Sequence, residues 1–569
     1  MDSFLQAPPT LPDAWGSDRI LRDALRWHLG DDLFTRVEDE FAEMGAWATS
    51  RPTLELAARA EQESPQLIPY GPWGHRLDDV RVSDAYLELG RKGVAAGITA
   101  LPYESSDYGD RARLVWAGLL ALWGPSSALY SCPVAMTDGA ARTLLEHGGA
   151  DDMMVVGRLT TRDFDSAWTS GQWMTETTGG SDVSQTSTIA RRDEDGAWRL
   201  YGTKWFTSAV NADVALALAR PEGAGDGSSS LALFRVHLKQ PDGVGTNHIR
   251  VRRLKDKLGT RALPTAELEL EGAVAHPVGD PREGGGIRRI STMLNITRVH
   301  NALGSAGALA RGLAWARSYA SVREVGGKLL REHDIHRAVL ADLAVDYAAA
   351  LELSLRCAEL LGKAEHGTIT DDEKTLFRGL VPVAKLATAK WAVAGVTEAM
   401  ESIGGVAYCE DSTIPALVRN THVLPIWEGT TNVLALDFLR SATSTDALKA
   451  VIKDATRALE DADLVAEATK HTAAVRRALE LLTDKDQDLA DRPEAGRLFA
   501  RTLGFGVANT YACARLCSQG AWAASRGDMR GLGIAGRMVQ RGLLPPGPAT
   551  ALELGMDEEP AATDATSPD

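Results

Sequence analysis

The sequence predicts an α+β protein in which a β domain lies between helical blocks. Apolar residues recur with a helical period over residues 17–170 and again over residues 287–440, where long stretches are rich in Ala and Leu. Over residues 171–278 the pattern changes to short alternating runs separated by Gly-, Asp- and Pro-rich turns, which is typical of strands. A chain of 569 residues is long enough for several such domains.

Each block contains stretches that match its predicted structure. The first helices are expected in DRILRDALRWHLGDDLFTRVEDEFAEMGAWA and ARLVWAGLLALWG, and the strands in TSTIARR, WRLYGTKWFTS, VALALAR, SLALFRVHL, NHIRVRRL and TAELELEGA. Long helices follow in STMLNITRVHNALGSAGALARGLAWARSYASV and VPVAKLATAKWAVAGVTEAMESIGG, with lengths that suit an antiparallel bundle.

These changes of pattern divide the chain into five segments. They are an N-terminal helical domain (residues 1–170), a central β domain (171–285), a four-helix bundle (286–443), an additional helical region (444–542) and a tail (543–569). The tail is rich in Pro, Ala and acidic residues and has little to bury, so we expect it to be disordered. Where the three blocks meet, we expect a crevice that favours a ligand site.

Composition and charge argue against several classes of protein. The net charge of -16 repels phosphate backbones and anionic lipid, so neither nucleic acid nor a membrane is a favoured partner. The five Cys form no CxxC pair, and the N-terminal residues lack the basic and apolar regions of a signal peptide. No uninterrupted apolar run of about 18 residues occurs. We therefore expect a cytoplasmic protein.

Common catalytic and nucleotide-binding motifs do not explain the chain. Neither GxxxxGK[ST] nor GxSxG is present, and the GLGIAG that begins at Gly531 has no strand before it. His333 and His336 are about one helical turn apart but lack an HExxH motif or a neighbouring Cys pair, so we predict no metal site. Cys513 and Cys517 fit the buried face of a helix better than redox chemistry.

Three segments combine residues that suit ligand binding or catalysis. The turn over residues 173–186, WMTETTGGSDVSQT, is dense in hydroxyl and backbone N–H donors, which can hold an anion. In GTKWFTS, Phe206 and Ser208 lie on a strand and either face a planar ligand or pack in the core. In IWEGTTN, Glu428 follows an apolar pair, so its carboxylate should be partly desolvated.

The chain resembles the acyl-CoA dehydrogenases and is most similar to their AidB-like branch, which is linked to the adaptive response to alkylation. The resemblance rests on YGPWGHRLDDVR, CPVAMT, MTETTGGSDV, GTKWF, RLKDKLGTR, STMLNITRVHNALGS, GGVAYCEDS and IWEGTTNV, which follow the family's order between Tyr70 and Arg440. It implies an acyl-CoA dehydrogenase-like fold with an N-terminal helical domain, a central β-barrel domain and a C-terminal four-helix bundle. The AidB-like branch adds a further helical region.

The resemblance also implies a bound FAD between the β domain and the bundle. Residues that match family contacts to this cofactor are Met174, Thr175, Gly180, Ser181, Phe206, Ser208, Thr430 and Asn432. In the family a second subunit completes the site, and the residues that match its contribution are Arg323, Gly404 and Gly405. Paired glycines allow close approach to a phosphate, and Arg can bind one bidentately. The resemblance also implies a homotetramer, the usual assembly of the family.

The catalytic residues implied by the resemblance are Glu428 and Arg298. Glu428 matches the base that removes the α-proton of an acyl-CoA or similar thioester, while the β-hydrogen leaves as hydride to flavin N5. An electron-acceptor protein is a further expected partner. Arg298 matches an Arg at the base of the pocket and is expected to steady the Glu428 carboxylate or the reacting head group.

Two other functions are open to a chain of this branch. One is a flavoprotein that binds DNA and protects it from alkylation, for which RPEAGRLFARTLG and RGDMRGLGIAGRMVQRG are locally basic, although the same residues fit solvated faces. The other is a flavoenzyme of secondary metabolism that reuses the fold for a different oxidation. Glu428 favours the dehydrogenase function, because a protein that does not abstract a proton needs no carboxylate at this position.

Overall fold

The computed structural model describes residues 6–104, 108–240, 245–491 and 493–545. The N-terminal block is helical, and α5 is buried along nearly its whole length against α2, α8 and α9. The helices of this block are α1 (Arg19–Leu29), α2 (Asp31–Thr49), α3 (Arg51–Gln62), α4 (Asp84–Ala95), α5 (Ala112–Trp123), α6 (Ser131–His147) and α7 (Ala150–Leu159).

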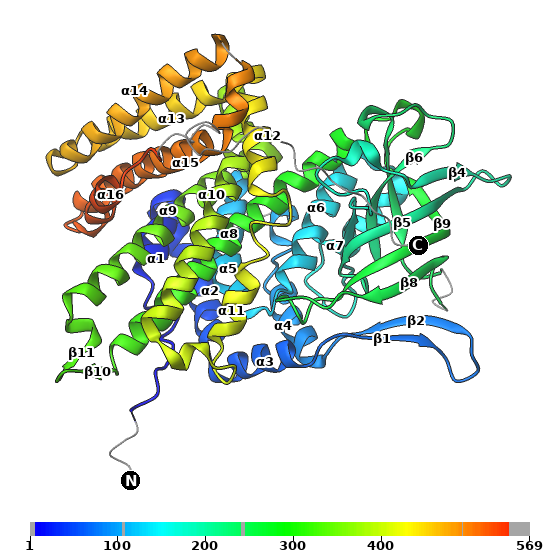
Figure 1. The fold of residues 1–569 in the computed structure, drawn as a ribbon, viewed down its shortest axis with the longest axis horizontal. Helices are drawn as coiled ribbons and strands as arrows, with labels where there is room; N and C mark the ends of the chain where they lie inside the picture. Colours follow the sequence, from blue (N-terminus) through cyan, green and yellow to red (C-terminus); the bar gives the residue numbers. More distant parts are fainter. Residues whose placement is uncertain (1–5, 105–107, 241–244, 492, 546–569) are drawn as a thin grey trace, which may run out of the picture.

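The N-terminal block also contains an antiparallel hairpin, which the sequence analysis did not predict. β1 (Gln66–Tyr70) pairs with β2 (Arg76–Arg81) across a Gly-Pro-Trp-Gly turn. The hairpin extends beside the β domain (Figure 1), where Arg76 donates to the Val251 carbonyl and the Val251 N–H donates to Asp78. It therefore ties the first block to the β domain.

The central domain is a barrel-like sheet. Its strands follow the order β3-β6-β4-β5-β9-β7, β8 pairs with β9, and an additional pairing between β6 and β7 closes the path. Every residue of β6 is buried, as expected for a strand at the centre of the domain. The strands are β3 (Ser170–Trp173), β4 (Ile189–Arg192), β5 (Trp198–Ser208), β6 (Val214–Pro221), β7 (Ala232–His237), β8 (Ile249–Leu254) and β9 (Thr265–Pro277).

Long helices then form the bundle. They are α8 (Gly286–Ala320), α9 (Asp334–Glu365), α10 (Asp371–Ile403), α11 (Ile414–Thr421) and α12 (Thr431–Thr445), with a small hairpin of β10 (Glu324–Val325) and β11 (Lys328–Leu329) after α8. By length and composition α10 is apolar enough to cross a membrane, but 78% of its most apolar stretch is buried inside the protein, as in the core helix of a bundle.

The additional helical region packs on the bundle. Its helices are α13 (Ala447–Ala462), α14 (Thr469–Asp491), α15 (Pro493–Ala524) and α16 (Arg530–Arg541). The long α15 contacts α9, α10 and α12 of the bundle as well as its own neighbours (Figure 1). Cys513 and Cys517 are buried there, and the GLGIAG motif lies within α16. Most of the tail, residues 546–569, lies outside the described residues.

A buried ion cluster joins the N-terminal block to the bundle. Arg113 of α5 is fully buried and donates to both oxygens of Asp138 at 2.6 and 2.9 Å and of Glu365 at 2.6 and 2.8 Å. His300 of α8 contacts Asp138 at 2.9 Å. Burial alone raises the pKa of Asp138, but the charge of Arg113 and the bond from His300 outweigh it and lower the pKa.

A second buried ion cluster joins the N-terminal block to the additional helical region. The ring nitrogens of His28 lie 3.1 Å from Glu352 and 3.4 Å from Glu359. Arg515 of α15 and Arg356 of α9 bind the same carboxylates at 2.9 Å. Burial alone lowers the pKa of His28, but the two carboxylates outweigh it and raise the pKa. The imidazolium form is thereby favoured.

Gly259 brings the loop between β8 and β9 against the backbone of α11. A Cβ at this position would stand 2.6 Å from the carbonyl carbon and oxygen of Arg419. We therefore expect Gly259→Ala to destabilise the protein by about 1–3 kcal/mol, because the two backbones must separate. Thermal unfolding measures this effect. Gly157→Ala is the control, because no described atom lies within 4 Å of its Cβ; an equal loss in both variants would contradict the argument.

Candidate active site

Glu428 lies in a strained turn at the junction of the bundle and the β domain. Its neighbour Trp427 packs against the cores of both. Glu428 is half-buried, and its φ of 56° lies in the left-handed region that residues other than Gly rarely adopt. Gly429 continues the turn with a φ of 101°. Such strain persists only where surrounding contacts hold it, and it clusters at functional sites.

The Glu428 carboxylate contacts two polar side chains that the sequence analysis missed. The Thr297 hydroxyl of α8 donates to Glu428 Oε2 at 2.5 Å, and the Gln172 side chain of β3 is a second hydrogen-bond partner. Burial raises the pKa of Glu428, and these bonds together with the charges of Arg298 and Lys385 offset only part of that rise. A carboxylate in this state is suited to take a proton from a weak carbon acid.

Arg298, predicted as a second catalytic residue, supports the backbone of the Glu428 turn. Its Nε donates to the Glu428 carbonyl at 3.3 Å, and its guanidinium binds Asp437 of α12 at 3.0 Å. Arg378 of α10 binds the other oxygen of Asp437 at 2.6 Å. Arg298 thus hydrogen-bonds to the main chain of the base, and its charge lies close enough to lower the pKa of the Glu428 carboxyl.

The residues of the β domain predicted to contact the cofactor form one group. Met174 and Thr175 follow β3, and the Trp205 N–H of β5 donates to the Thr175 carbonyl at 3.0 Å. Phe206 is the next residue on β5, and Ser208, at its end, shares a hydrogen bond with a Thr of β9. The strand pairing therefore places the turn after β3 beside the end of β5.

A buried ion pair anchors the donor-rich turn that contains Gly180 and Ser181. Lys204 of β5 is fully buried and donates to Glu176 at 2.7 Å. Gly180 packs closely on Thr175, because a Cβ would stand 2.5 Å from the Thr175 hydroxyl. Gly180 and Ser181 themselves are exposed. The turn is thus held in place by the buried pair, while Gly180 and Ser181 remain accessible.

Thr430 and Asn432 lie at the N-terminus of α12, directly after the base. Thr430 is the N-cap residue, and within the described chain its hydroxyl makes no capping bond to the helix. The first N–H groups of a helix favour an anionic ligand. Asn432 accepts a hydrogen bond from Arg501 of α15 at 2.9 Å. The additional helical region therefore reaches this turn, a contact that the sequence analysis missed.

The structure does not bring Arg323, Gly404 and Gly405 to this group. Arg323 lies between α8 and the β10–β11 hairpin, at the end of the bundle away from the β domain (Figure 1). Gly404 lies near the same end, because Tyr319 of α8 and Ile403 of α10 share one hydrophobic cluster. Arg323, Gly404 and Gly405 are exposed, and no described atom lies within 4 Å of a Cβ placed on either glycine.

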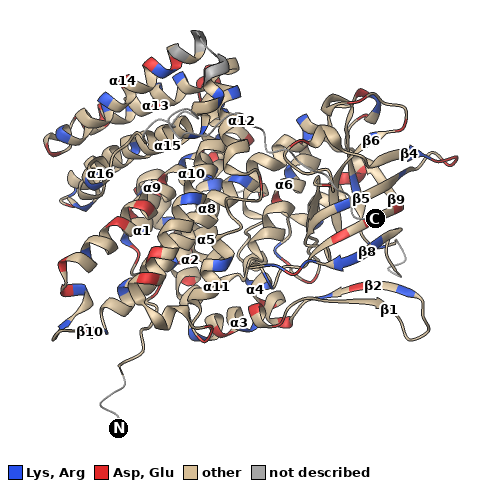
Figure 2. Cartoon of the chain, in the orientation of Figure 1, with Lys and Arg blue, Asp and Glu red and all other residues tan. Residues whose placement is uncertain are grey.

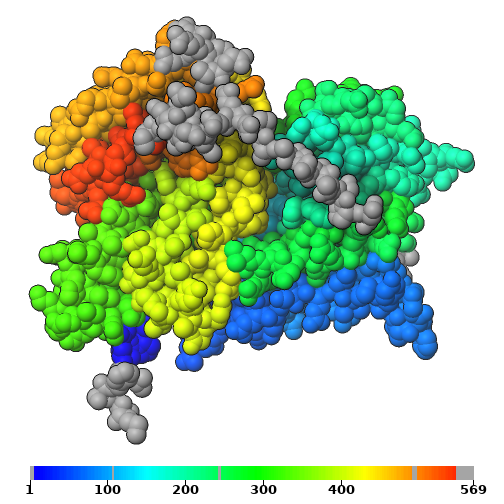
Figure 3. Space-filling model, in the orientation of Figure 1, coloured from blue at the N-terminus to red at the C-terminus, as the bar shows by residue number. Residues whose placement is uncertain are grey.

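Exposed apolar side chains on β5 and on the Glu428 turn suit a flat cofactor. Phe206 is 57% exposed, and Ile426, two residues before the base, is 63% exposed. The molecular surface is hollowed where the bundle meets the β domain (Figure 3). Exposed apolar groups beside hydroxyls and a helix N-terminus match the two parts of FAD, a flat ring system and a pyrophosphate. The residues present therefore fit this cofactor.

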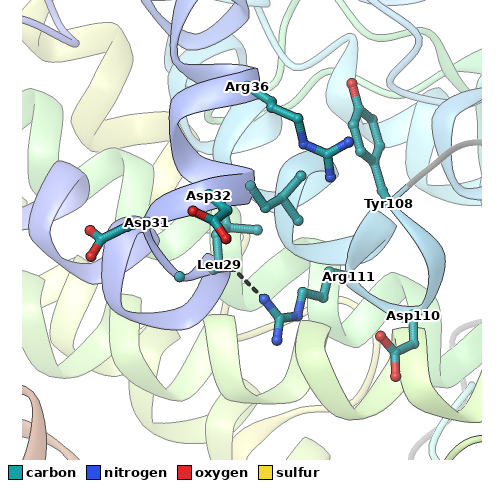
Figure 4. A pocket seen from close by; sticks show the side chains of 9 residues that line it. Leu29, Asp31, Asp32, Arg36, Tyr108, Asp110 and Arg111 are labelled. Atoms are coloured by element: carbon teal, nitrogen blue, oxygen red, sulfur yellow. Dashed lines mark hydrogen bonds between the residues drawn. The ribbon is translucent and has the colours of Figure 1, made fainter.

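Two cavities in the described structure lie elsewhere. One, of about 570 Å³, is lined mainly by polar residues of α2 and of the segment before α5, where Arg111 donates to the Leu29 carbonyl (Figure 4). The other, of about 590 Å³, lies between the start of α14 and α16. Neither is lined by Glu428 or by the predicted cofactor contacts. Among the described residues no cluster of three or more His, Cys, Asp or Glu is arranged to hold a metal ion.

Comparison with known proteins places the three domains in one family. Residues 6–166 match the adaptive response protein AidB N-terminal domain, residues 171–273 the acyl-CoA dehydrogenase middle domain, and residues 284–443 the acyl-CoA dehydrogenase C-terminal domain. Acyl-CoA dehydrogenase family member 11 of Caenorhabditis elegans is 42% identical over 448 residues, 77% of this chain and 72% of that protein. Putative acyl-CoA dehydrogenase AidB of Escherichia coli is 35% identical over 412 residues, 71% of this chain and 73% of that protein.

Solved structures agree with this assignment. C. elegans ACDH-11, crystallised in complex with C11-CoA, has a TM-score of 0.92 at 37% identity, covering 96% of this chain and 94% of that one. An acyl-CoA dehydrogenase from Bacillus anthracis complexed with FAD shares the fold, with a TM-score of 0.70 at 16% identity over 94% of this chain and 90% of that one. The chain therefore belongs to the AidB-like branch of the acyl-CoA dehydrogenase family, FAD-dependent oxidoreductases that act on the CH–CH groups of acyl-CoA.

Proposed function

We propose that the protein introduces a double bond between the α- and β-carbons of an acyl thioester, with FAD as its cofactor. The observation that carries this proposal is Glu428, a half-buried carboxylate with a raised pKa in a strained turn at the domain junction. A protein that only bound the cofactor, or DNA, would not need a carboxylate in such a position.

Glu428 removes the α-proton of the thioester, and the electron pair of that C–H bond forms the double bond as the β-hydrogen leaves with its own pair. Bound FAD supplies the acceptor for this hydride. The hydrogen bonds from Thr297 and Gln172 orient the carboxylate, and burial favours its neutral form once the proton has been transferred. Trp427, the residue before the base, packs against both cores and contributes to the burial of the turn.

The cofactor site is proposed to use two copies of the chain. Met174, Thr175, Phe206 and Ser208 bind the ring of FAD, and the turns that contain Gly180, Ser181, Thr430 and Asn432 bind its polar part. Arg323, Gly404 and Gly405 lie on a separate exposed surface, so they are suited to serve the FAD of a second copy. Val406 and Tyr408 beside them are 57% and 79% exposed, which favours coverage by another subunit in a homotetramer.

The proposed substrate class is a linear acyl-CoA of medium to long chain. The support is the 96% coverage of this chain by a relative that was crystallised with C11-CoA. The test is an anaerobic titration of the purified flavoprotein with butyryl-, isovaleryl-, undecanoyl- and palmitoyl-CoA, followed by the visible flavin bands. We expect undecanoyl-CoA to bleach them at the lowest concentration. Bound flavin that none of the four thioesters reduces would contradict the proposal.

Thr297→Val should shift the pH dependence of flavin reduction to higher pH. The pKa of Glu428 is raised, and the rate should fall as the pH falls through it, because a protonated carboxyl cannot accept the α-proton. The Thr297 hydroxyl stabilises the ionised form, so its removal raises the pKa further. Single-turnover rates across the pH range measure the shift. Thr292 lies on the same helix as Thr297 and donates to Glu146 of α6, so Thr292→Val is the control and should not move the profile.

The charges of the additional helical region favour DNA binding less than they would if its Lys and Arg were free of partners. Lys and Arg on α13 and α14 are interspersed with Asp and Glu, whereas α16 carries Arg and no acidic residue (Figure 2). Arg526, Arg530, Arg537 and Arg541 each form an ion pair with an Asp of the same chain. A phosphate backbone would have to replace these pairs, which reduces the gain from releasing counterions. The acyl-CoA reaction therefore remains our proposal.

A further inference from the structure

Lys385 is a buried cation directly behind the Glu428 turn. It lies on α10, is fully buried, and donates from Nζ to the Trp427 carbonyl and to the Gly429 carbonyl, both at 2.7 Å. These are the two residues that flank the base. The negative charge of Glu428 favours the protonated form of Lys385, and the positive charge of Arg298 opposes it.

Two basic side chains therefore hold three consecutive carbonyl groups. Lys385 binds those of residues 427 and 429, and Arg298 binds that of residue 428 from the opposite helix, α8. The central residue has the left-handed backbone that a residue with a side chain resists. Arg298 is itself fixed by Asp437, whose other oxygen binds Arg378. The turn is held from two helices, so the base cannot relax to an ordinary backbone conformation without breaking these bonds.

A neutral donor would satisfy the same carbonyl groups, so the choice of a buried ammonium calls for a further reason. Burial lowers the pKa of Lys385 to about 7, which shows that the site disfavours its charge. The charge has one evident effect: it stabilises the ionised form of Glu428, the form that accepts a proton. Lys385 thereby combines the positioning of the base with its electrostatic support.

We propose that Lys385 is a positioning residue for proton abstraction, which locks the strained turn so that the Glu428 carboxylate meets the α-carbon. This inference rests on the proposed function. In this role Lys385 contacts neither the thioester nor the cofactor. Its loss should therefore impair proton transfer while leaving the binding of both ligands intact.

The test is the exchange of the α-protons of undecanoyl-CoA for deuterium in D2O, followed by mass spectrometry on the flavoprotein. Exchange reports reversible proton abstraction: the α-proton passes to Glu428, exchanges with solvent, and deuterium returns to the α-carbon when the reaction reverses, so no net oxidation is required. For Lys385→Met we expect a loss of at least about tenfold in the exchange rate, within the range that positioned proton transfer contributes. The dissociation constant for undecanoyl-CoA and the FAD content should stay within about twofold of the parent values. The acidic limb of the pH profile should also shift to higher pH, because a positive charge near Glu428 is lost.

Two further variants keep the outcomes distinct. Lys390→Met changes a partly buried Lys five residues later on α10 and should exchange like the parent protein. Lys385→Gln retains N–H donors without the charge, so it provides a folded protein if the Met variant is too unstable, and its pH profile should still shift. Unchanged exchange and an unchanged profile in both Lys385 variants would overturn the inference. If undecanoyl-CoA causes neither exchange nor bleaching of the flavin bands in the parent protein, the proposed function fails instead.

Discussion

Glu428→Gln should lower the rate of flavin reduction by acyl-CoA by about two to four orders of magnitude. The amide has nearly the shape of the carboxylate and can still accept the hydrogen bond from Thr297, but it cannot take the α-proton. The turn should survive, because its supporting bonds come to the main chain from Lys385 and Arg298. Anaerobic stopped-flow measurement of the flavin bands gives the rate.

The binding of cofactor and substrate separates a catalytic defect from a structural one. FAD content and the dissociation constant of undecanoyl-CoA should be close to those of the parent protein. Glu398→Gln removes the same charge from an exposed position on α10 and should leave the rate unchanged. Full turnover by Glu428→Gln on a substrate that the parent protein oxidises would show that another group is the base.

Arg113→Met should lower the free energy of unfolding by about 3–5 kcal/mol, the usual cost of removing one partner from a buried ion cluster. Arg113, Asp138 and Glu365 are all nearly devoid of exposed side-chain surface. Loss of the guanidinium leaves two buried carboxylates that His300 and Arg142 compensate only in part. Because the cluster joins α5, α6 and α9, the defect should appear in the main unfolding transition, measured with urea.

A second substitution tests whether uncompensated charge is the cause. Adding Asp138→Asn to Arg113→Met removes one of the orphaned carboxylates, so it should restore part of the lost stability. Strictly additive losses would contradict this explanation. Arg51→Ala breaks an exposed pair with Glu55 and should leave the transition unchanged, because solvent screens that pair.

The order of domains and the place of the base could be predicted from local patterns. Helical and alternating periods record which face of each element is buried, so the change to strands near residue 171 is visible in the sequence. The β1–β2 hairpin was missed, although the alternation on both sides of its Gly-Pro-Trp-Gly turn is a usable signal. Glu428 could also be predicted, because the residues that form its turn follow one another in the chain and match a family motif.

The partners of the base could not be predicted, because tertiary contacts leave no local pattern. Thr297 and Glu428 are 131 positions apart, and Arg501 and Asn432 are 69 apart. Lys385 did leave a signal: it interrupts the apolar stretch VPVAKLATA in a core helix. A Lys at such a position is seldom fully buried unless its charge or its donors have partners. The signal indicates a buried polar contact but does not name the carbonyl groups that satisfy it.

The ion cluster around His28 sets a lower limit on the time in which a new chain can complete its fold. His28 binds Glu352, and the same carboxylate binds Arg515, which emerges from the ribosome 487 residues after His28. At about 5–20 residues per second, the ribosome takes about 25–100 s to span that distance. During this interval α1 can dock on α9 only without Arg515, the residue of α15 that binds Glu352. The contact between α1 and α9 therefore reaches its final form only after α15 has been synthesised.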